Sequence, residues 1–259
     1  MKSSAISKIY MVLVLLIIYL PMVLVVVYSF NYSKISTVWG GFSFKWYVEL
    51  FKNKEMAEAL KNSIIIALSS SLISAAVGTA AAVGIHKSRA LIDKGVSRLA
   101  TIPLMMPEII MGMVFLALFS ALGLKMGLLT IILVHCSFCI PYVIMTVNSS
   151  LEQFDYSTLD AAHDLGAGGM RAFFEITVPQ LMPGIISGML LSFAMSMDDV
   201  VISFFVTGPG TNTLPIKIFS QLRKGVTPEI NALCTLMLAV TIILGILARL
   251  VRKPFLKQK

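Results

Sequence analysis

Residues 148–180 read NSSLEQFDYSTLDAAHDLGAGGMRAFFEITVPQ, and they separate two long apolar runs of the chain. Ser157 followed by Asp160 predicts a helix start of the capping-box kind, with Asp in the usual place of Glu. Gly166 predicts a left-handed C-cap that ends this short helix. A second short helix is expected at about 170–177, so the stretch predicts a helix-turn-helix between two membrane spans.

The first of these short helices is predicted to be slender and acidic. Ala161 and Ala162 leave one side of it without bulk, which allows another protein to approach closely. Its acids stand out against tails and loops that are mostly basic, and such a knob suits the cleft of a partner protein. The acids of the segment are Glu152, Asp155, Asp160 and Asp164.

The rest of the chain has the composition of a membrane protein. It is 57% hydrophobic and only 13% charged, whereas a soluble domain carries roughly 25% charged residues. A membrane-spanning helix needs about 20 apolar residues, and the 259 residues accommodate about six of them. We therefore predict an all-α integral membrane protein with one domain over 1–259 and spans at about 9–30, 62–85, 99–122, 126–147, 181–205 and 230–251.

The first apolar run, 9–30, could be either a signal peptide or a membrane span. It is longer than the 7–15-residue apolar core of a signal peptide, and no small-residue cleavage motif follows it, so we predict an uncleaved span. The run 62–85 is rich in Ser, Ala and Gly, which predicts a helix buried in a bundle. Aromatic residues at helical spacing within 44–51 predict a short helix in the membrane interface, either as an anchor or as a partner contact.

The net charge of +8 is explained by basic residues that set the orientation of the spans in the membrane. Lys and Arg gather in the short loop 86–98 and the tail 252–259, and basic residues near span ends favour the cytoplasmic side, where they also meet anionic lipid. With an even number of spans, both termini are expected in the cytoplasm. Nucleic-acid binding is excluded because no basic helix or aromatic and basic surface lies outside the spans.

Three acids fall inside the apolar runs: Glu108, Asp198 and Asp199. A carboxylate in the bilayer centre costs about 2.5–3.5 kcal/mol on insertion scales, so each should face a cavity, a partner helix or a passing cation. We expect Glu108 near mid-membrane and Asp198 nearer the outer mouth, both lining a substrate path and pairing with ammonium groups. Adjacent helical residues point about 100° apart, so Asp198 and Asp199 cannot both face that path equally. The alternative is a structural bond to a neighbouring helix.

Other residues near these acids are weaker candidates. Pro103 and Pro107 predict a break beside Glu108, because broken helices often mark substrate sites in transporters. His135 and Tyr142 are predicted to line the cavity. Cys136 and Cys139 lie on one helical face with His135, and packing explains them better than a metal site. No phosphate-binding loop motif occurs, so ATP hydrolysis is not expected in this chain and no cofactor is assigned to it.

The segment 148–180 resembles the EAA loop of bacterial ABC importer permeases. That pattern is Glu-Ala-Ala, then Gly three residues on, then nine residues and Ile-x-Leu-Pro. The matching residues here are Ala161, Ala162, Gly166, Ile176 and Pro179, while Asp160 replaces Glu and Val178 replaces Leu. Nearly the whole chain further resembles the PotC-type permeases of spermidine/putrescine importers, most clearly over 106–111, 192–201, 205–209, 214–218 and 228–232.

The resemblance implies a MetI-like fold in the bacterial inner membrane. It implies a homologous second permease subunit, two ATPase subunits that bind ATP and Mg²⁺, and a periplasmic or lipid-anchored substrate-binding protein. The substrate class is a polyamine, and the choice between spermidine and putrescine stays open. The residues that couple to the ATPase would be Asp160, Ala161, Ala162, Gly166, Ile176 and Pro179.

Two other classes of function remain as alternatives. A membrane-embedded enzyme would need paired catalytic residues, and only Asp198, Asp199 or the His-Cys cluster are available. A stand-alone secondary transporter predicts inverted repeats, and the sequence has no visible repeat. Among importers, an anion or a metal chelate is the alternative substrate. Acids inside the spans without Lys or Arg beside them favour a cation.

Overall fold

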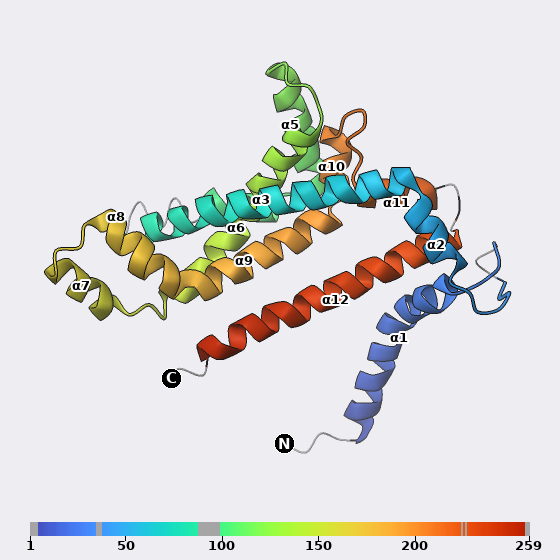
Figure 1. Cartoon of the computed structure of the whole chain (residues 1–259), viewed down its shortest axis with the longest axis horizontal. Helices are drawn as coiled ribbons and strands as arrows, with labels where there is room; N and C mark the ends of the chain where they lie inside the picture. The colour runs from blue at the N-terminus through green and yellow to red at the C-terminus, as the bar shows by residue number, and fades with distance from the viewer. Residues whose placement is uncertain (1–4, 35–37, 88–98, 224, 226, 257–259) are drawn as a thin grey trace. The chain divides into compact units, whose positions relative to one another are not determined.

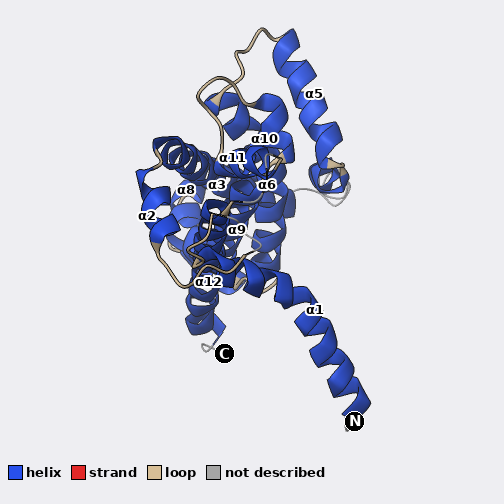
Figure 2. Ribbon diagram, turned by 90° about the vertical axis from the view of Figure 1, so that its right-hand side faces the viewer, coloured by secondary structure: helices blue, strands red, loops and turns tan. Residues whose placement is uncertain are grey.

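The computed structural model describes residues 5–34, 38–87, 99–223, 225 and 227–256, and these are helical apart from loops and a one-residue bridge between Asn31 and Phe42. Figure 2 shows this helix-and-loop composition. The all-α prediction is therefore confirmed for the described chain. Its contacts divide it into two compact units, Met1–Glu58 with Lys217–Ile243 and Ala59–Ile216 with Leu244–Lys259.

The first unit contains the N-terminal helix α1 (Ala5–Ser29) and the short amphipathic helix α2 (Lys45–Lys52). The apolar side chains of α1 are exposed, as expected of a helix that faces lipid or another subunit. Helix α2 buries Trp46 and attaches to the end of α1, because the Trp46 indole N–H donates to the Asn31 carbonyl at 2.7 Å and the Tyr47 hydroxyl bonds Ser29 at 2.7 Å. Most of helix α12 (Pro228–Leu256) also lies in this unit.

The second unit contains most of the long helices. In Figure 1, α3, α6 and α9 run alongside one another, with α7 and α8 at one end and α5 and α10 at the other. The contacts between α6 and α9 are the most extensive, and α5 packs on α10. The elements are α3 (Lys54–Lys87), α5 (Glu108–Ala121), α6 (Leu128–Leu151), α7 (Tyr156–Asp164), α8 (Gly169–Ala172), the π-helical turn η1 (Phe173–Thr177), α9 (Val178–Asp198), α10 (Val201–Val206) and the start of α11 (Leu214–Leu222).

Small residues set the distance between these three long helices. On α3 the buried face is made largely of Ser, Ala and Gly, while Leu68, Leu72 and Val77 are exposed. A Cβ atom at Gly78 would lie 2.7 Å from the Val143 side chain of α6, and one at Gly184 of α9 would lie 2.7 Å from the Thr146 carbonyl. Helices in lipid gain little from burying large apolar side chains, so close backbone contact supplies the packing energy.

The number of helices that can cross a membrane is lower among the described residues than the six predicted from the sequence. Four described helices are long and apolar enough to cross a membrane: Ser7–Ser29, Lys54–His86, Leu128–Leu151 and Gly169–Asp198. A fifth is the bent pair Leu99–Met105 and Glu108–Ala121, and the described apolar part of α12, Pro228–Ile243, is shorter. The predicted count of about six thus compares with four to five by length and composition among the described residues. The basic loop at 88–98 and the tail at 257–259 lie outside them.

The boundary near Pro179 is a correction to the sequence prediction. No separate second short helix exists at 170–177, because α8, η1 and α9 form one continuous helix from Gly169. The wide turn η1 places the Val178 N–H on the Phe173 carbonyl, five residues back. Pro179 follows in the first turn of α9, where its missing N–H is tolerated. The helix therefore begins about twelve residues before the apolar run does.

Gly184 tests the close packing of α9 on α6. We expect Gly184→Ala to lower the free energy of unfolding by about 1–3 kcal/mol, because the new methyl group meets the Thr146 carbonyl and the Ser150 hydroxyl. The matched control is Gly84→Ala on α3, where no atom lies within 4 Å of the new Cβ and the helix gains about 1 kcal/mol of propensity. Thermal unfolding of the purified full-length protein in detergent measures both. Equal midpoints for the two variants would contradict this packing.

Candidate functional site

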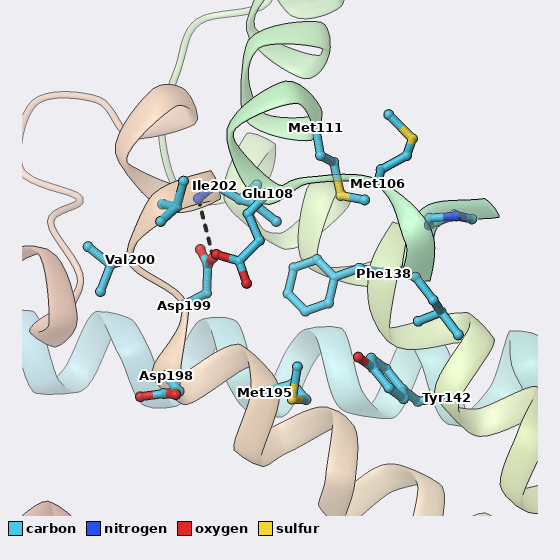
Figure 3. Close-up of a pocket in the computed structure, with 13 residues that line it drawn as sticks. Met106, Glu108, Met111, Phe138, Tyr142, Met195, Asp198, Asp199, Val200 and Ile202 are labelled. Atoms are coloured by element: carbon cyan, nitrogen blue, oxygen red, sulfur yellow. Dashed lines mark hydrogen bonds between the residues drawn. The ribbon is translucent and has the colours of Figure 1, made fainter. Parts of the chain in front are cut away.

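A cavity of about 310 Å³ lies in the second unit, where two helices are interrupted. One interruption separates Leu99–Met105 from α5, and the other separates α9 from α10. Figure 3 shows the cavity between these two breaks and the side of α6. Its lining residues are Pro103, Leu104, Met106, Glu108, Met111, Phe138, Tyr142, Met195, Asp198, Asp199, Val200, Val201 and Ile202.

The first break places Glu108 at the cavity. The residue before a proline is driven away from helical dihedrals, and the helix ends at Met105, with Pro107 in an extended conformation (φ −57°, ψ 132°). The chain then turns by 114° into α5. Glu108 becomes the first residue of α5, where the positive end of the helix dipole favours a carboxylate. The break predicted from Pro103 and Pro107 is present in the structure.

The second break separates the two neighbouring aspartates. Asp198 ends α9 and is exposed, whereas the backbone of Asp199 is extended (ψ 123°) and its side chain is only 5% exposed. The Asp199 carboxylate accepts hydrogen bonds from the backbone N–H groups of Ile202 (3.2 Å) and Ser203 (2.7 Å), which caps α10. The two carboxylates thus occupy different environments because the chain leaves the helix between them, although both line the cavity.

The lining of the cavity suits a cation. It contains three acids and neither Lys nor Arg among the described residues that form it. In Figure 3 the carboxylates of Glu108 and Asp199 point toward one another, and Asp198 lies further away at the end of α9. The rings of Phe138 and Tyr142 complete one wall, and aromatic faces also attract ammonium groups. An organic cation would relieve the repulsion between the carboxylates.

Four of the five predicted path residues meet at this one cavity: Glu108, Tyr142, Asp198 and Asp199. His135 does not line it, because its side chain is fully buried behind the wall. The capping role of Asp199 was missed by the sequence analysis. Its signal is an Asp directly before a short apolar run, which is a typical helix start. Whether these residues form the substrate path remains a prediction.

The cysteines of α6 pack between helices. The Cys139 thiol donates to the Ser192 carbonyl of α9 at 3.5 Å, and the Cys136 thiol lies 3.9 Å from the Ser70 carbonyl of α3. Weak thiol donors of this kind behave as small apolar side chains. Within the described residues, no group of three His, Cys, Asp or Glu side chains is arranged to hold a metal ion.

The helix α7, expected to couple to a partner, has clear signals at both ends. Its N-cap is Asp155, which corrects the prediction of Ser157. The Asp155 carboxylate accepts bonds from the Ser157 N–H (3.0 Å), the Ser157 hydroxyl (2.7 Å) and the Thr158 hydroxyl (3.0 Å). Because a charged acceptor is stronger than a hydroxyl, Asp155 takes the cap and Ser157 becomes a donor to it.

The C-terminal end of α7 is as predicted. Gly166 has a left-handed backbone (φ +83°). Its N–H donates to the His163 carbonyl at 2.9 Å, and the Ala167 N–H donates to the Ala162 carbonyl at 2.9 Å. This pair of bonds is the Schellman motif, which suits Gly because it has no Cβ.

Several of the predicted coupling residues lie on an exposed surface formed by α7 and the start of the next helix. Asp160 and Ala161 are exposed, and Leu165 is 89% exposed just beyond the helix. Met170 and Phe174 are also exposed on the next helix, while Ile176 is partly buried and Pro179 exposed. A single-sided apolar surface beside an acid is typical of a protein contact. On its other side, α7 is attached to α3 by the Tyr156 hydroxyl, which lies 2.6 Å from the His86 ring.

Comparisons with known proteins agree with this architecture. Residues 74–255 match the family model described as binding-protein-dependent transport system inner membrane component. The putrescine transport system permease protein PotI of Escherichia coli (strain K12) is 45% identical over 238 residues, which cover 89% of this chain and 85% of the relative. The spermidine/putrescine transport system permease protein PotC of Haemophilus influenzae is 38% identical over 94% of this chain and 95% of its own.

A solved structure shows the same fold at low identity. It is a bacterial alginate ABC transporter in complex with an alginate pentasaccharide-bound periplasmic protein. One of its chains is similar to this one with a TM-score of 0.71 and 16% identity, covering 96% of this chain and 95% of that one. At this low identity, the TM-score is what supports the shared fold, and it shows the fold alone.

Asp155 offers a test of how α7 is held. Hydrogen bonds from the Ser157 and Thr158 hydroxyls keep the pKa of the Asp155 carboxyl below its usual range, so the charged cap is favoured in the folded state. This stabilisation is present above the unfolded pKa of about 3.9 and is lost as the pH falls through the lowered folded pKa. We expect Asp155→Ala to reduce amide-exchange protection in the first turn of α7 several-fold, and Asp155→Asn to reduce it less, because Asn keeps an acceptor.

The measurement is hydrogen–deuterium exchange of the purified full-length protein. In the unmodified protein, we expect the protection factors of the first turn of α7 to be constant from about pH 5 to pH 8, because Asp155 stays charged there. The control is Asp164→Ala at the last residue of the same helix, which removes an acid but no cap. Equal loss of protection in both variants would show that Asp155 does not hold the helix start.

Proposed function

The chain belongs to the family of inner membrane components of binding-protein-dependent transport systems, and from this we propose that it is the permease subunit of an ATP-driven importer for polyamines. The substrate class is supported by the names of its relatives, which transport putrescine or spermidine and putrescine. It is also supported by the cavity, whose lining holds three acids and neither Lys nor Arg among the described residues. The grouping of Glu108, Asp198 and Asp199 is the observation that carries the proposal.

A polyamine fits this cavity chemically better than a single point charge does. Its ammonium groups are separated by apolar methylene chains. The cavity offers carboxylates at two helix breaks, with Met106, Met111 and the Phe138 ring beside them. We propose that Glu108 and Asp199 bind one ammonium group, and that Asp198 and the Tyr142 hydroxyl meet the next part of the chain. Each carboxylate then stays compensated while the substrate is dehydrated.

The partners follow from the same proposal. A homologous second permease would cover exposed apolar faces such as those of α1 and α5, together with lipid. Two ATPase subunits would bind ATP and Mg²⁺, and Asp160, Ala161, Ala162, Gly166, Ile176 and Pro179 would couple to them. A periplasmic or lipid-anchored binding protein would deliver the substrate. The alginate transporter, a fold relative that is complexed with a periplasmic protein, supports this last partner.

The topology is part of the proposal as well. A segment that contacts an ATPase must lie in the cytoplasm, so α7 and the exposed surface around Leu165 are assigned to that side. With six spans, both termini lie there too. The basic tail at 252–259 would then meet anionic headgroups of the inner leaflet.

Neutral variants of the acids test the substrate path. We expect Glu108→Gln and Asp198→Asn each to reduce polyamine uptake at least about tenfold, because each removes a charge that compensates an ammonium group while keeping its volume. Uptake of labelled spermidine and putrescine is measured in proteoliposomes that contain this chain, its partner permease and the ATPase, with binding protein outside and ATP inside.

The matched control for this test is Glu58→Gln, an exposed acid near the start of α3 and outside the cavity lining. It should leave uptake unchanged. Normal uptake in both path variants would reject the path. ATP turnover stimulated by binding protein without any polyamine uptake by the unmodified complex would keep the importer and reject the substrate class.

The left-handed cap of α7 tests the coupling role. Gly166→Val forces a β-branched residue to φ near +83°, a conformation that costs on the order of 1–2 kcal/mol. We expect ATP-dependent uptake to fall at least about fivefold while the two permeases still assemble, because the surface offered to the ATPase is displaced.

Gly168→Val is the matched control two residues away. Gly168 has an ordinary extended backbone (φ −66°, ψ 154°) and no atom within 4 Å of a new Cβ. Uptake should be close to that of the unmodified complex. If Gly166→Val and Gly168→Val transport equally well, the cap has no part in coupling.

A further inference from the structure

His135 lies on α6, the helix whose Phe138 and Tyr142 line the cavity, and its side chain is fully buried. Its ring reaches both sides of the break between α9 and α10. The Nδ1 atom is 2.6 Å from the Ser196 hydroxyl, in the last turn of α9, and Nε2 is 2.9 Å from the Ser203 hydroxyl, in the first turn of α10. The same Nε2 is 3.3 Å from Oδ2 of Asp199, inside the break itself.

The protonation of the ring follows from these partners. A carboxylate oxygen has lone pairs but no proton to offer, so the Nε2 that faces Asp199 must carry the hydrogen. Nδ1 then accepts from the Ser196 hydroxyl when the ring is neutral. Ser196 in turn receives a bond from the Ser70 hydroxyl of α3 at 3.2 Å. One ring thus connects polar groups of α3, α9 and α10 to α6.

The His135 ring adds a polar contact to α10, a short helix that also packs through apolar side chains against α5 and α6. This helix has only six residues, Val201–Val206, too short to be stable alone. It is tied to α6 at its far end by the Thr130 hydroxyl, which donates to the Val206 carbonyl at 2.9 Å. His135 and Ser203 form the corresponding tie at its near end. Two polar contacts, together with the apolar packing of Ile202 and Val206, therefore hold α10 against α6.

Asp199 is the group that depends most on this arrangement. Its buried carboxylate is held by the N–H groups of Ile202 and Ser203 and by the His135 ring, and its remaining open side faces Glu108 across the cavity. Removing one partner of a buried charge leaves that charge undercompensated. The carboxylate then has reason to turn or to take up a proton, and the cavity loses one of its anionic groups.

We propose that His135 is a positioning residue of the cation cavity: it fixes the α9–α10 break and holds the Asp199 carboxylate toward the substrate without contacting the substrate itself. This inference rests on the proposed transport of polyamines and deepens it. It replaces the expectation that His135 lines the path.

The test separates the two sides of the ring. In a Gln side chain the amide nitrogen reaches about as far as Nε2 of His, whereas an Asn amide reaches only as far as Nδ1. His135→Gln therefore keeps a donor for Asp199 and Ser203, and His135→Asn keeps only the Ser196 contact. His135→Leu removes both.

We expect the apparent KM for spermidine uptake to rise at least about tenfold for His135→Leu and His135→Asn and less than about threefold for His135→Gln. Cys136→Ala, the next residue on the same helix and also buried, is the control and should keep the unmodified KM. Uptake is measured over a range of spermidine concentrations in the reconstituted complex with its binding protein.

Each outcome decides a distinct point. An unmodified complex that imports no polyamine overturns the proposed function, and with it this inference. A complex that imports spermidine but has the same KM in all three His135 variants overturns the inference alone. Equal KM values for Gln and Asn, with loss confined to the yield of complex, would reduce His135 to a packing residue. If His135→Leu does not assemble, the comparison of Gln with Asn still decides.

Discussion

A chain that crosses lipid must satisfy its backbone N–H and C=O groups within itself, and this constraint governs the centre of the second unit. Two of its helices are nevertheless interrupted, before Glu108 and after Asp198. Interrupted backbone is tolerated at membrane depth only where protein or a water-filled cavity surrounds it. Here the two interruptions face the same cavity, so the groups that each break exposes are available to the same bound molecule.

The two breaks differ in how visible they are in the sequence. Pro103 and Pro107 predict the break before Glu108, because proline restricts the backbone of its own neighbours through local sterics. The second contains neither Pro nor Gly. It is stabilised by the side chain of Asp199 and by His135, which is distant in sequence. The one local signal of this break is therefore the capping Asp199. Long-range contacts of this kind have no local signature.

The ends of the segment around α7 are set by local interactions. Gly166 could be identified because a left-handed cap is a property of one residue, and the helix before it followed. The start was misplaced by two residues because Asp155 and Ser157 compete for the same N–H groups, and the charged acceptor prevails. The continuous helix from Gly169 was missed because Pro179 was expected to end the short helix at 170–177, whereas it lies in the first turn of α9, where its missing N–H is tolerated.

That continuity has a mechanical consequence. From Gly169 to Asp198 the chain is a single run of 30 helical residues, roughly 45 Å at 1.5 Å per residue. One end carries the exposed surface next to α7, and the other carries Asp198 at the cavity. A stiff helix passes a displacement along its length, and the displacement is released where the helix stops, between Asp198 and Val201. The His135 ring bridges that point, so under the proposed function the end of the helix that starts at the ATPase-facing surface is also the place where the Asp199 carboxylate is held. In the proposed transporter, binding of a cation and a displacement of α9 would act on the same few hydrogen bonds, as linkage between two sites requires.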